Sequence, residues 1–197
     1  MPRNPKAITL GPGTMHVADA GTADPVVTFA GGKIVVTLGA AFSDVGYTEN
    51  GSQITYSLDS EPVRVAEELE DVLHKTTGRS GAVAFEMAEE TVRNMTLAFN
   101  GGTVTTSGTG ATEGWTYEPP DLGNEQRRCL FWLSEDQTVA FFFRQVFQTG
   151  SVTIGRRPGA EKSTIPVEFS LEKPSGIKPF KVWGAGAVRG GGAVVSA

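Results

Sequence analysis

Residues 78–102, GRSGAVAFEMAEETVRNMTLAFNGG, decide the fold class of this 197-residue chain, because their hydrophobic period changes in the middle. Over 83–87 large apolar residues alternate with small or charged ones, the period-2 pattern of a half-buried strand. Apolar residues then recur at intervals of four, three and four, which predicts a helix over about 89–100. The Asn-Gly-Gly at 100–102 favours a left-handed stop. The predicted core face of this helix consists of Val92, Met95 and Phe99.

The composition indicates that the rest of the chain is mainly β. The 25 glycines and 11 prolines imply many turns, and a hydrophobic content of 39% is enough for a sizeable core. We therefore expect two packed β-sheets, in a sandwich or barrel, flanked by one α-helix. The expected organisation is a single domain over 1–183, followed by a Gly-rich flexible tail over 184–197. Within the domain we expect an N-terminal arm (about 1–25) and two long loops (about 41–77 and 101–126).

Turn signals and apolar runs locate the expected strands. Gly31-Gly32 predicts a hairpin between strands over 26–29 and 33–38, and Asn50-Gly51 predicts a second hairpin turn. Further strands are expected at 128–133, 138–147 and 165–171. The run TVAFFFRQVF at 138–147 is apolar on both faces, so both must be covered, by this chain or by a neighbouring subunit.

The sequence offers little for catalysis. The only histidines are His16 and His74, both in segments that look like loops, and the single cysteine, Cys129, lies in a strand-like apolar run. No metal-ligand spacing is present, and the carboxylates of 67–71 are typical of a solvated face. We therefore expect no enzyme activity, no catalytic residues, no cofactor and no metal site.

Charge and hydropathy restrict the partners. The net charge of −5 and the absence of a clustered basic face argue against tight nucleic-acid binding. No run approaches the roughly 18 apolar residues of a membrane span, and the N-terminal MPRNPKAITLGPG has no apolar core of a secretory signal. We expect synthesis in a reducing cytoplasm and no membrane partner.

Four segments, in order, carry a resemblance to a known family. They are GYTENGSQITY (46–56), VRVAEELEDV (63–72), the run TTGRSGAVAFEMAEETVRNMTLAFNGG (76–102) and IPVEFSLEK (165–173). Over about residues 44–173 the chain resembles the major tail proteins, or tail tube proteins, of long-tailed bacteriophages, particularly those that infect actinobacteria. The 101–126 insertion is not part of the shared pattern.

The resemblance implies a structural virion protein of the tail. Such proteins form hexameric rings that stack into a hollow tube, through which DNA passes without specific binding. It implies self-association and contacts with tape measure, tail tip and terminator proteins. It also implies that the segment around 41–77 connects one ring to the next, and its assembly residues would be Tyr47, Glu49, Asn50, Gly51 and Tyr56.

Two questions remain open at this stage. Glu168 and Glu172 lie opposite the apolar side chains of their strand, facing either the lumen or the outer solvent. The alternative function is a β-sandwich recognition or adhesin module that binds a carbohydrate or protein on a cell surface, and Trp115 and Tyr117 are its candidate contact residues.

Overall fold

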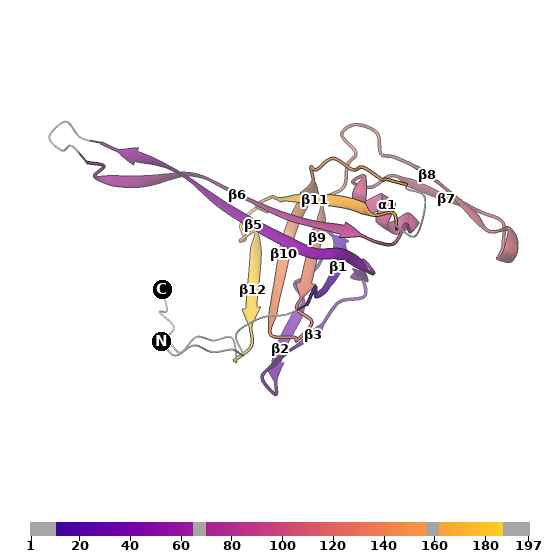
Figure 1. Ribbon diagram of the computed structural model, residues 1–197, viewed down its shortest axis with the longest axis horizontal. Coiled ribbons are helices and arrows are strands. Elements are labelled where there is room, and N and C mark those ends of the chain that lie inside the picture. The colour runs from indigo at the N-terminus through magenta and orange to yellow at the C-terminus, as the bar shows by residue number, and fades with distance from the viewer. Residues whose placement is uncertain (1–10, 65–69, 157–161, 187–197) are drawn as a thin grey trace.

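Twelve β-strands and one α-helix are found in residues 11–64, 70–156 and 162–186, the part of the chain that the computed structural model describes (Figure 1). The helix is α1 (Val92–Ala98), and no helix of these residues is long and apolar enough to span a membrane. The strands are β1 (Thr14–Asp19), β2 (Val26–Ala30), β3 (Lys33–Thr37), β4 (Ser43–Asp44), β5 (Thr48–Val63), β6 (Leu73–Met87), β7 (Thr103–Ser107), β8 (Gly114–Glu118), β9 (Arg128–Leu133), β10 (Val139–Gln148), β11 (Ile165–Leu171) and β12 (Phe180–Gly184).

The main sheet folds over on β10 to make two layers. Its order is β4-β1-β9-β10-β11-β6-β5, and β12 also pairs with β10. The first part of β10 pairs with β9 and β12, whereas only its last three residues pair with β11. A register shift between Phe143 and Val146 marks the bulge where the strand bends. As a result β5, β6 and β11 cross over β1, β9 and β10 (Figure 1). The expected mainly β fold with one flanking helix is confirmed, as a sandwich-like arrangement and not a closed barrel.

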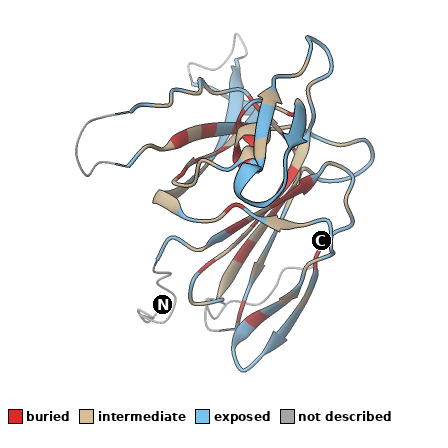
Figure 2. Cartoon of the chain, turned by 90° about the vertical axis from the view of Figure 1, so that its right-hand side faces the viewer, coloured by how far each residue is buried: buried red, intermediate tan, exposed pale blue. Residues whose placement is uncertain are grey.

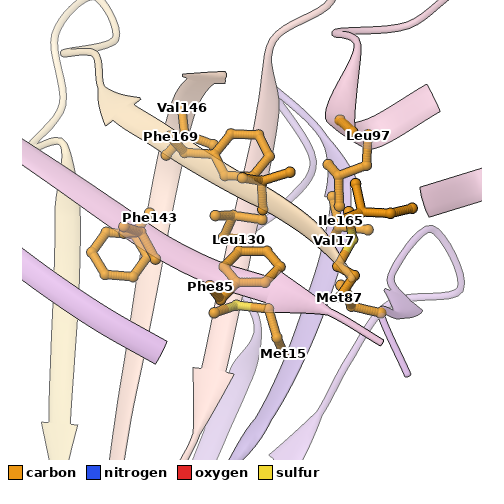
Figure 3. Packing of buried hydrophobic residues seen from close by; sticks show 14 residues of the cluster. Met15, Val17, Phe85, Met87, Leu97, Leu130, Phe143, Val146, Ile165 and Phe169 are labelled. Atoms are coloured by element: carbon orange, nitrogen blue, oxygen red, sulfur yellow. The ribbon is translucent and has the colours of Figure 1, made fainter. Parts of the chain in front are cut away.

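The principal core lies between these two layers. Phe169 and Phe143 are almost completely buried, and Phe169 stacks on Phe85 with ring centroids 5.9 Å apart (Figure 3). Burying each such ring stabilises the fold by about 1.5–3 kcal/mol. The other buried members of this cluster are Met15, Val17, Val45, Val83, Met87, Leu97, Ala98, Leu130, Val146, Ile165 and Val167.

A second core covers the opposite face of β9 and β10. Phe131 and Phe142 are buried there beside Ile34, which comes from the β2–β3 hairpin. Alternation along β10 therefore sends Phe143 into the first core and Phe142 into the second. The prediction that 138–147 needs two covered faces is confirmed, and this chain supplies both covers.

Cys129 belongs to the second core and is completely buried. Burial raises the pKa of its thiol to about 11, so the reactive thiolate is scarce at neutral pH. We expect a thiol reagent such as dithionitrobenzoate to leave the native protein unmodified at pH 8 and to react fully once the protein is unfolded. Reaction of the native protein at the rate of free cysteine would contradict this placement.

Several sequence expectations are corrected. Residues 14–19 of the expected arm form β1, in the interior of the main sheet, because Met15 and Val17 supply core side chains. The expected loops at 41–77 and 101–126 consist largely of two β-hairpins, β5–β6 and β7–β8, and the burial map shows exposed residues on the projecting segments (Figure 2). Strand β12 was not predicted. Of the expected tail, 187–197 lies outside the described residues, and so does 1–10 of the arm.

Candidate assembly surface

The β5–β6 hairpin extends far beyond the rest of the molecule (Figure 1). Strand β11 pairs with β6 only from Ala82 to Met87, so the hairpin beyond Tyr56 and Gly81 is a two-stranded ribbon. We call its described residues 57–64 and 70–80 the ribbon, and nearly all of them are exposed. An isolated pair of strands is marginally stable in water, and exposed apolar groups add to that cost. The large apolar side chains exposed on the ribbon are Leu58, Val63, Val72 and Leu73.

Asn50 and Gly51 do not form the hairpin turn that was predicted. They lie inside β5, where the register with β6 shifts between Glu49 and Ser52, and both have positive φ, 56° and 72°. The pair therefore forms a β-bulge, which uses the same left-handed conformations as an Asn-Gly turn. The strand continues past it because Ile54 packs against the principal core and keeps the two strands together. The chain reverses instead beyond Val63.

Tyr47 projects from the base of the hairpin and is 80% exposed. Its backbone is held firmly, since its N–H donates to Glu89 Oε1 at 3.1 Å and its carbonyl accepts from Ala88 N at 2.8 Å. Gly46 precedes it with φ +86°, and a Cβ there would collide with the Glu89 carboxylate. The structure thus presents an aromatic ring from a fixed position.

Three carboxylates gather on the outer face of the layer formed by β5, β6 and β11. Glu49 lies opposite Glu86, and Glu168 lies opposite Ala84, one position along the same face. An open hollow joins Glu49, Asn50, Gly51, Glu86 and Glu168. Lys162 forms an ion pair with Glu49. We call Glu49, Glu86 and Glu168 the acidic face. The sequence pattern placed Glu86 and Glu168 opposite the apolar side chains of their strands, but it did not bring them together with Glu49, because the three residues come from three strands.

Glu172 does not belong to the acidic face. It follows the end of β11, and its Oε2 accepts from Arg127 Nε at 3.2 Å and from Gln145 Nε2 at 2.6 Å. Of the two acids for which the lumen and the outer solvent were left open, only Glu168 is an exposed carboxylate on the outer face of the sheet.

The predicted helix was too long and its core face was partly wrong. Thr91 caps the helix, because its hydroxyl accepts from Asn94 N at 3.2 Å, so α1 begins at Val92. Val92 and Met95 are half-buried, but Phe99 is 37% exposed. The fully buried residues of the helix are instead Asn94, Leu97 and Ala98.

Asn94 explains why the buried face is rotated. Its side-chain amide donates to the carbonyls of Val45 (3.1 Å) and Glu89 (2.9 Å), so a polar residue occupies a core-facing position. The bond to Val45 joins the helix to the segment that leads into β5. A hydrophobic pattern does not reveal such a buried amide.

Phe99 fixes the second projecting hairpin, β7–β8. Its ring stacks on Tyr117 at 5.9 Å, and the Tyr117 hydroxyl donates to the Gly101 carbonyl at 2.7 Å. Farther along the hairpin Trp115 is 51% exposed. Residues 103–118 thus form an ordered projection anchored on the end of the helix.

The candidate catalytic groups are not brought together. His74 lies in the ribbon opposite Pro62, whereas Cys129 is in the second core, so they form no nucleophile–base pair. His16 is in β1, and burial lowers the pKa of its imidazole. Across 11–64, 70–156 and 162–186 no group of three His, Cys, Asp or Glu side chains has the arrangement of a metal site.

Among the comparisons with known proteins, only the comparison with solved structures gives a match. No protein-family model matches the chain, and no curated protein matches it either. Among solved structures the chain is similar to a chain described as part of the virion of a native gene transfer agent particle. The TM-score is 0.31 and the identity 13%, over 78% of this chain and 99% of that one.

Proposed function

We propose that this chain is a structural virion protein that polymerises as stacked rings, six subunits in each, into a phage tail tube. The tube would be the conduit for genome delivery, and tape measure, tail tip and terminator proteins would be its other partners. The proposal joins the resemblance of residues 44–173 to tail tube proteins with the shape of the molecule.

The observation that carries the proposal is the exposed β5–β6 ribbon. It presents Leu58, Val63, Val72 and Leu73 to solvent and leaves the outer backbone edge of β5 unpaired in the described residues. An unpaired strand edge exposes a monomer to unwanted association, whereas in a polymer it can pair with a neighbouring copy. Contacts between different surfaces of identical copies close into a ring where the rotation between copies allows it and otherwise repeat without end, so they can produce both rings and stacks of rings.

The direct test is negative-stain microscopy of the purified protein at increasing concentration, with the tail initiator proteins of its phage supplied. We expect rings and regular tubes. A protein that stays monomeric under all of these conditions would rule out the tail tube function.

In this proposal the acidic face lines the lumen and repels the DNA that passes it. Replacing Glu168 by Lys would place repeated positive charge along the DNA path, because each lysine near a phosphate releases counterions and adds affinity. We expect virions with Glu168→Lys to have normal tails, to eject DNA slowly at low salt and to recover partly at high salt. Glu172→Lys would also break the Arg127 pair, so it is the less specific variant.

Glu113→Lys is the control, since Glu113 is an exposed carboxylate on the β7–β8 projection. It should leave ejection unchanged. Normal ejection at low salt by the Glu168→Lys virions would remove Glu168 from the lumen.

The second candidate function is surface recognition, and exposed Trp115 on the β7–β8 hairpin favours it. Aromatic side chains on a fixed projection are frequent anchors of protein interfaces. Binding of the monomer to host cells that is lost on Trp115→Ala, in a protein that forms no tubes, would favour this function over the tail tube.

A further inference from the structure

A hollow at the base of the β5–β6 hairpin gathers three cations. Arg79 comes from β6, while Lys173 and Lys178 come from the connection between β11 and β12. The hollow also contains Tyr56 and Phe180, whose rings meet edge-on with centroids 5.5 Å apart. We call this site the basic hollow.

The cations of the basic hollow have no carboxylate partner within the described part of the chain. Two acids close to this part of the chain have other partners, since Glu172, next to Lys173, pairs with Arg127, and Asp24 pairs with Arg144. The hydrogen bonds from Arg144 hold the pKa of Asp24 below its ordinary value, so this second pair stays charged at neutral pH. The basic hollow therefore keeps a net positive charge in a chain whose net charge is −5.

The walls of the basic hollow are fixed before any ligand arrives. Arg144 Nη1 donates to the Lys178 carbonyl at 2.9 Å, and Arg144 N donates to the Pro179 carbonyl at 2.9 Å. At the other end of the connection, Glu172 N donates to the Gln145 carbonyl at 3.0 Å. A preformed site loses little conformational entropy on binding.

The chain carries a complementary anionic segment at the end of the ribbon. Among the described residues there, Glu61, Glu70 and Asp71 carry carboxylates and Arg64 carries a guanidinium. Glu61 and Glu70 are exposed, and Asp71 pairs with Arg64 at 2.6 Å. From Tyr56 to Val63 the strand advances by about 3.3 Å per residue, roughly 23 Å in all. A ribbon that stays extended over that length keeps its end away from the basic hollow at its own base, so an acidic segment in the basic hollow would come from another copy.

We propose that the acidic end of the ribbon of one copy binds the basic hollow of the next copy. The inference rests on the proposed function and names the acceptor of its inter-ring contact. Val72 or Leu73 would pack on the rings of Tyr56 and Phe180. Ion pairs with the three cations would determine how the ribbon is aligned in the basic hollow. Donor and acceptor lie on different parts of the chain, so the contact is heterologous and repeats from ring to ring.

Charge reversal tests the pairing. Lys173→Glu with Lys178→Glu should raise the protein concentration needed for tubes at least about tenfold, since like charges oppose the contact. Glu61→Lys with Glu70→Lys should do the same. Combining both pairs of changes in one chain should restore tubes. Lys33→Glu reverses an exposed cation in the β2–β3 turn region, and it should leave assembly unchanged.

Zero-length cross-linking tests the same contact without mutation. Tubes made from mixed ¹⁴N and ¹⁵N wild-type protein and treated with a carbodiimide should yield isotopically mixed peptides that join Lys173 or Lys178 to Glu61 or Glu70. The same peptides should be absent from monomers.

Failure of this inference differs from failure of the proposed function. Wild-type protein that never assembles rejects the tail tube function and this contact with it. If Lys173→Glu/Lys178→Glu forms tubes at the same concentration as the wild type, only the contact is rejected. The contact is also rejected if the variant that combines both pairs of changes assembles no better than the variants with one pair. Binding of duplex DNA that the lysine variant loses, with tubes unaffected, would assign the basic hollow to phosphate instead.

Discussion

Joining Tyr56 to Gly81 through a two-residue Asn-Gly turn, in place of residues 57–80, is expected to give a folded protomer that forms no tubes. Almost all of the removed described residues are exposed, and neither core cluster contains any of them. Ile54 and Val83 remain in place, so the hairpin stub keeps its packing against the principal core. We expect a melting temperature within a few degrees of the wild type and complete loss of tubes in negative-stain images.

Co-assembly supplies the control for this deletion. A truncated copy loses the ribbon and with it Arg79, but it retains Lys173, Lys178 and Phe180 of the basic hollow. It should therefore accept a wild-type neighbour, more weakly than the wild type does, and offer nothing to the next. Small amounts added to wild-type protein should therefore shorten the tubes. Truncated protein that makes tubes of normal length would show that the ribbon does not connect the rings.

Phe169→Ala is expected to cost about 3–5 kcal/mol of unfolding free energy, because it opens a cavity between the two layers of the sandwich. Phe169 is completely buried and stacks on Phe85. Phe99→Ala should cost far less, about 1 kcal/mol, since Phe99 is 37% exposed. Denaturant titration of the two variants measures the difference directly.

The two phenylalanine variants should also differ in where they act. Loss of the Phe99 ring removes the stacking partner of Tyr117, so amide exchange should quicken in the β7–β8 hairpin and stay slow in β9 and β10. Phe169→Ala should quicken exchange throughout the sheet. Equal destabilisation by the two substitutions would show that Phe99 belongs to the core face of the helix, as the sequence pattern predicted.

Local patterns in the sequence were informative where strands meet the core. Alternation over 83–87 and 165–171 predicted the end of β6 and all of β11, and the apolar run over 128–133 predicted β9. Gly31-Gly32 predicted the β2–β3 turn, where both glycines have positive φ. In these elements the hydrophobic period and the turn chemistry agree, so one reading of the pattern is favoured.

Other elements depend on partners that are distant in the chain. Asn50-Gly51 has the conformation of a hairpin turn but forms a bulge, because Ile54 beyond it still reaches the core. Residues 14–19 form an interior strand because β4 and β9 flank them, whereas the Gly- and Pro-rich composition of 1–25 as a whole is that of an irregular segment. The basic hollow and the acidic face were likewise hidden, since each combines side chains from strands or connections far apart in sequence.

The connectivity of the main sheet separates early from late folding events. The hairpins β2–β3, β5–β6 and β7–β8 pair neighbouring segments and close locally, whereas β1 must wait for β9, far along the chain. Non-local strand pairing is slow because loop-closure entropy is lost before the contacts form. During synthesis the ribbon therefore leaves the ribosome before Lys173 and Lys178 of the basic hollow do. In the proposed contact, nascent chains on one messenger would display the donor before its acceptor is complete, and this would confine polymerisation to finished molecules.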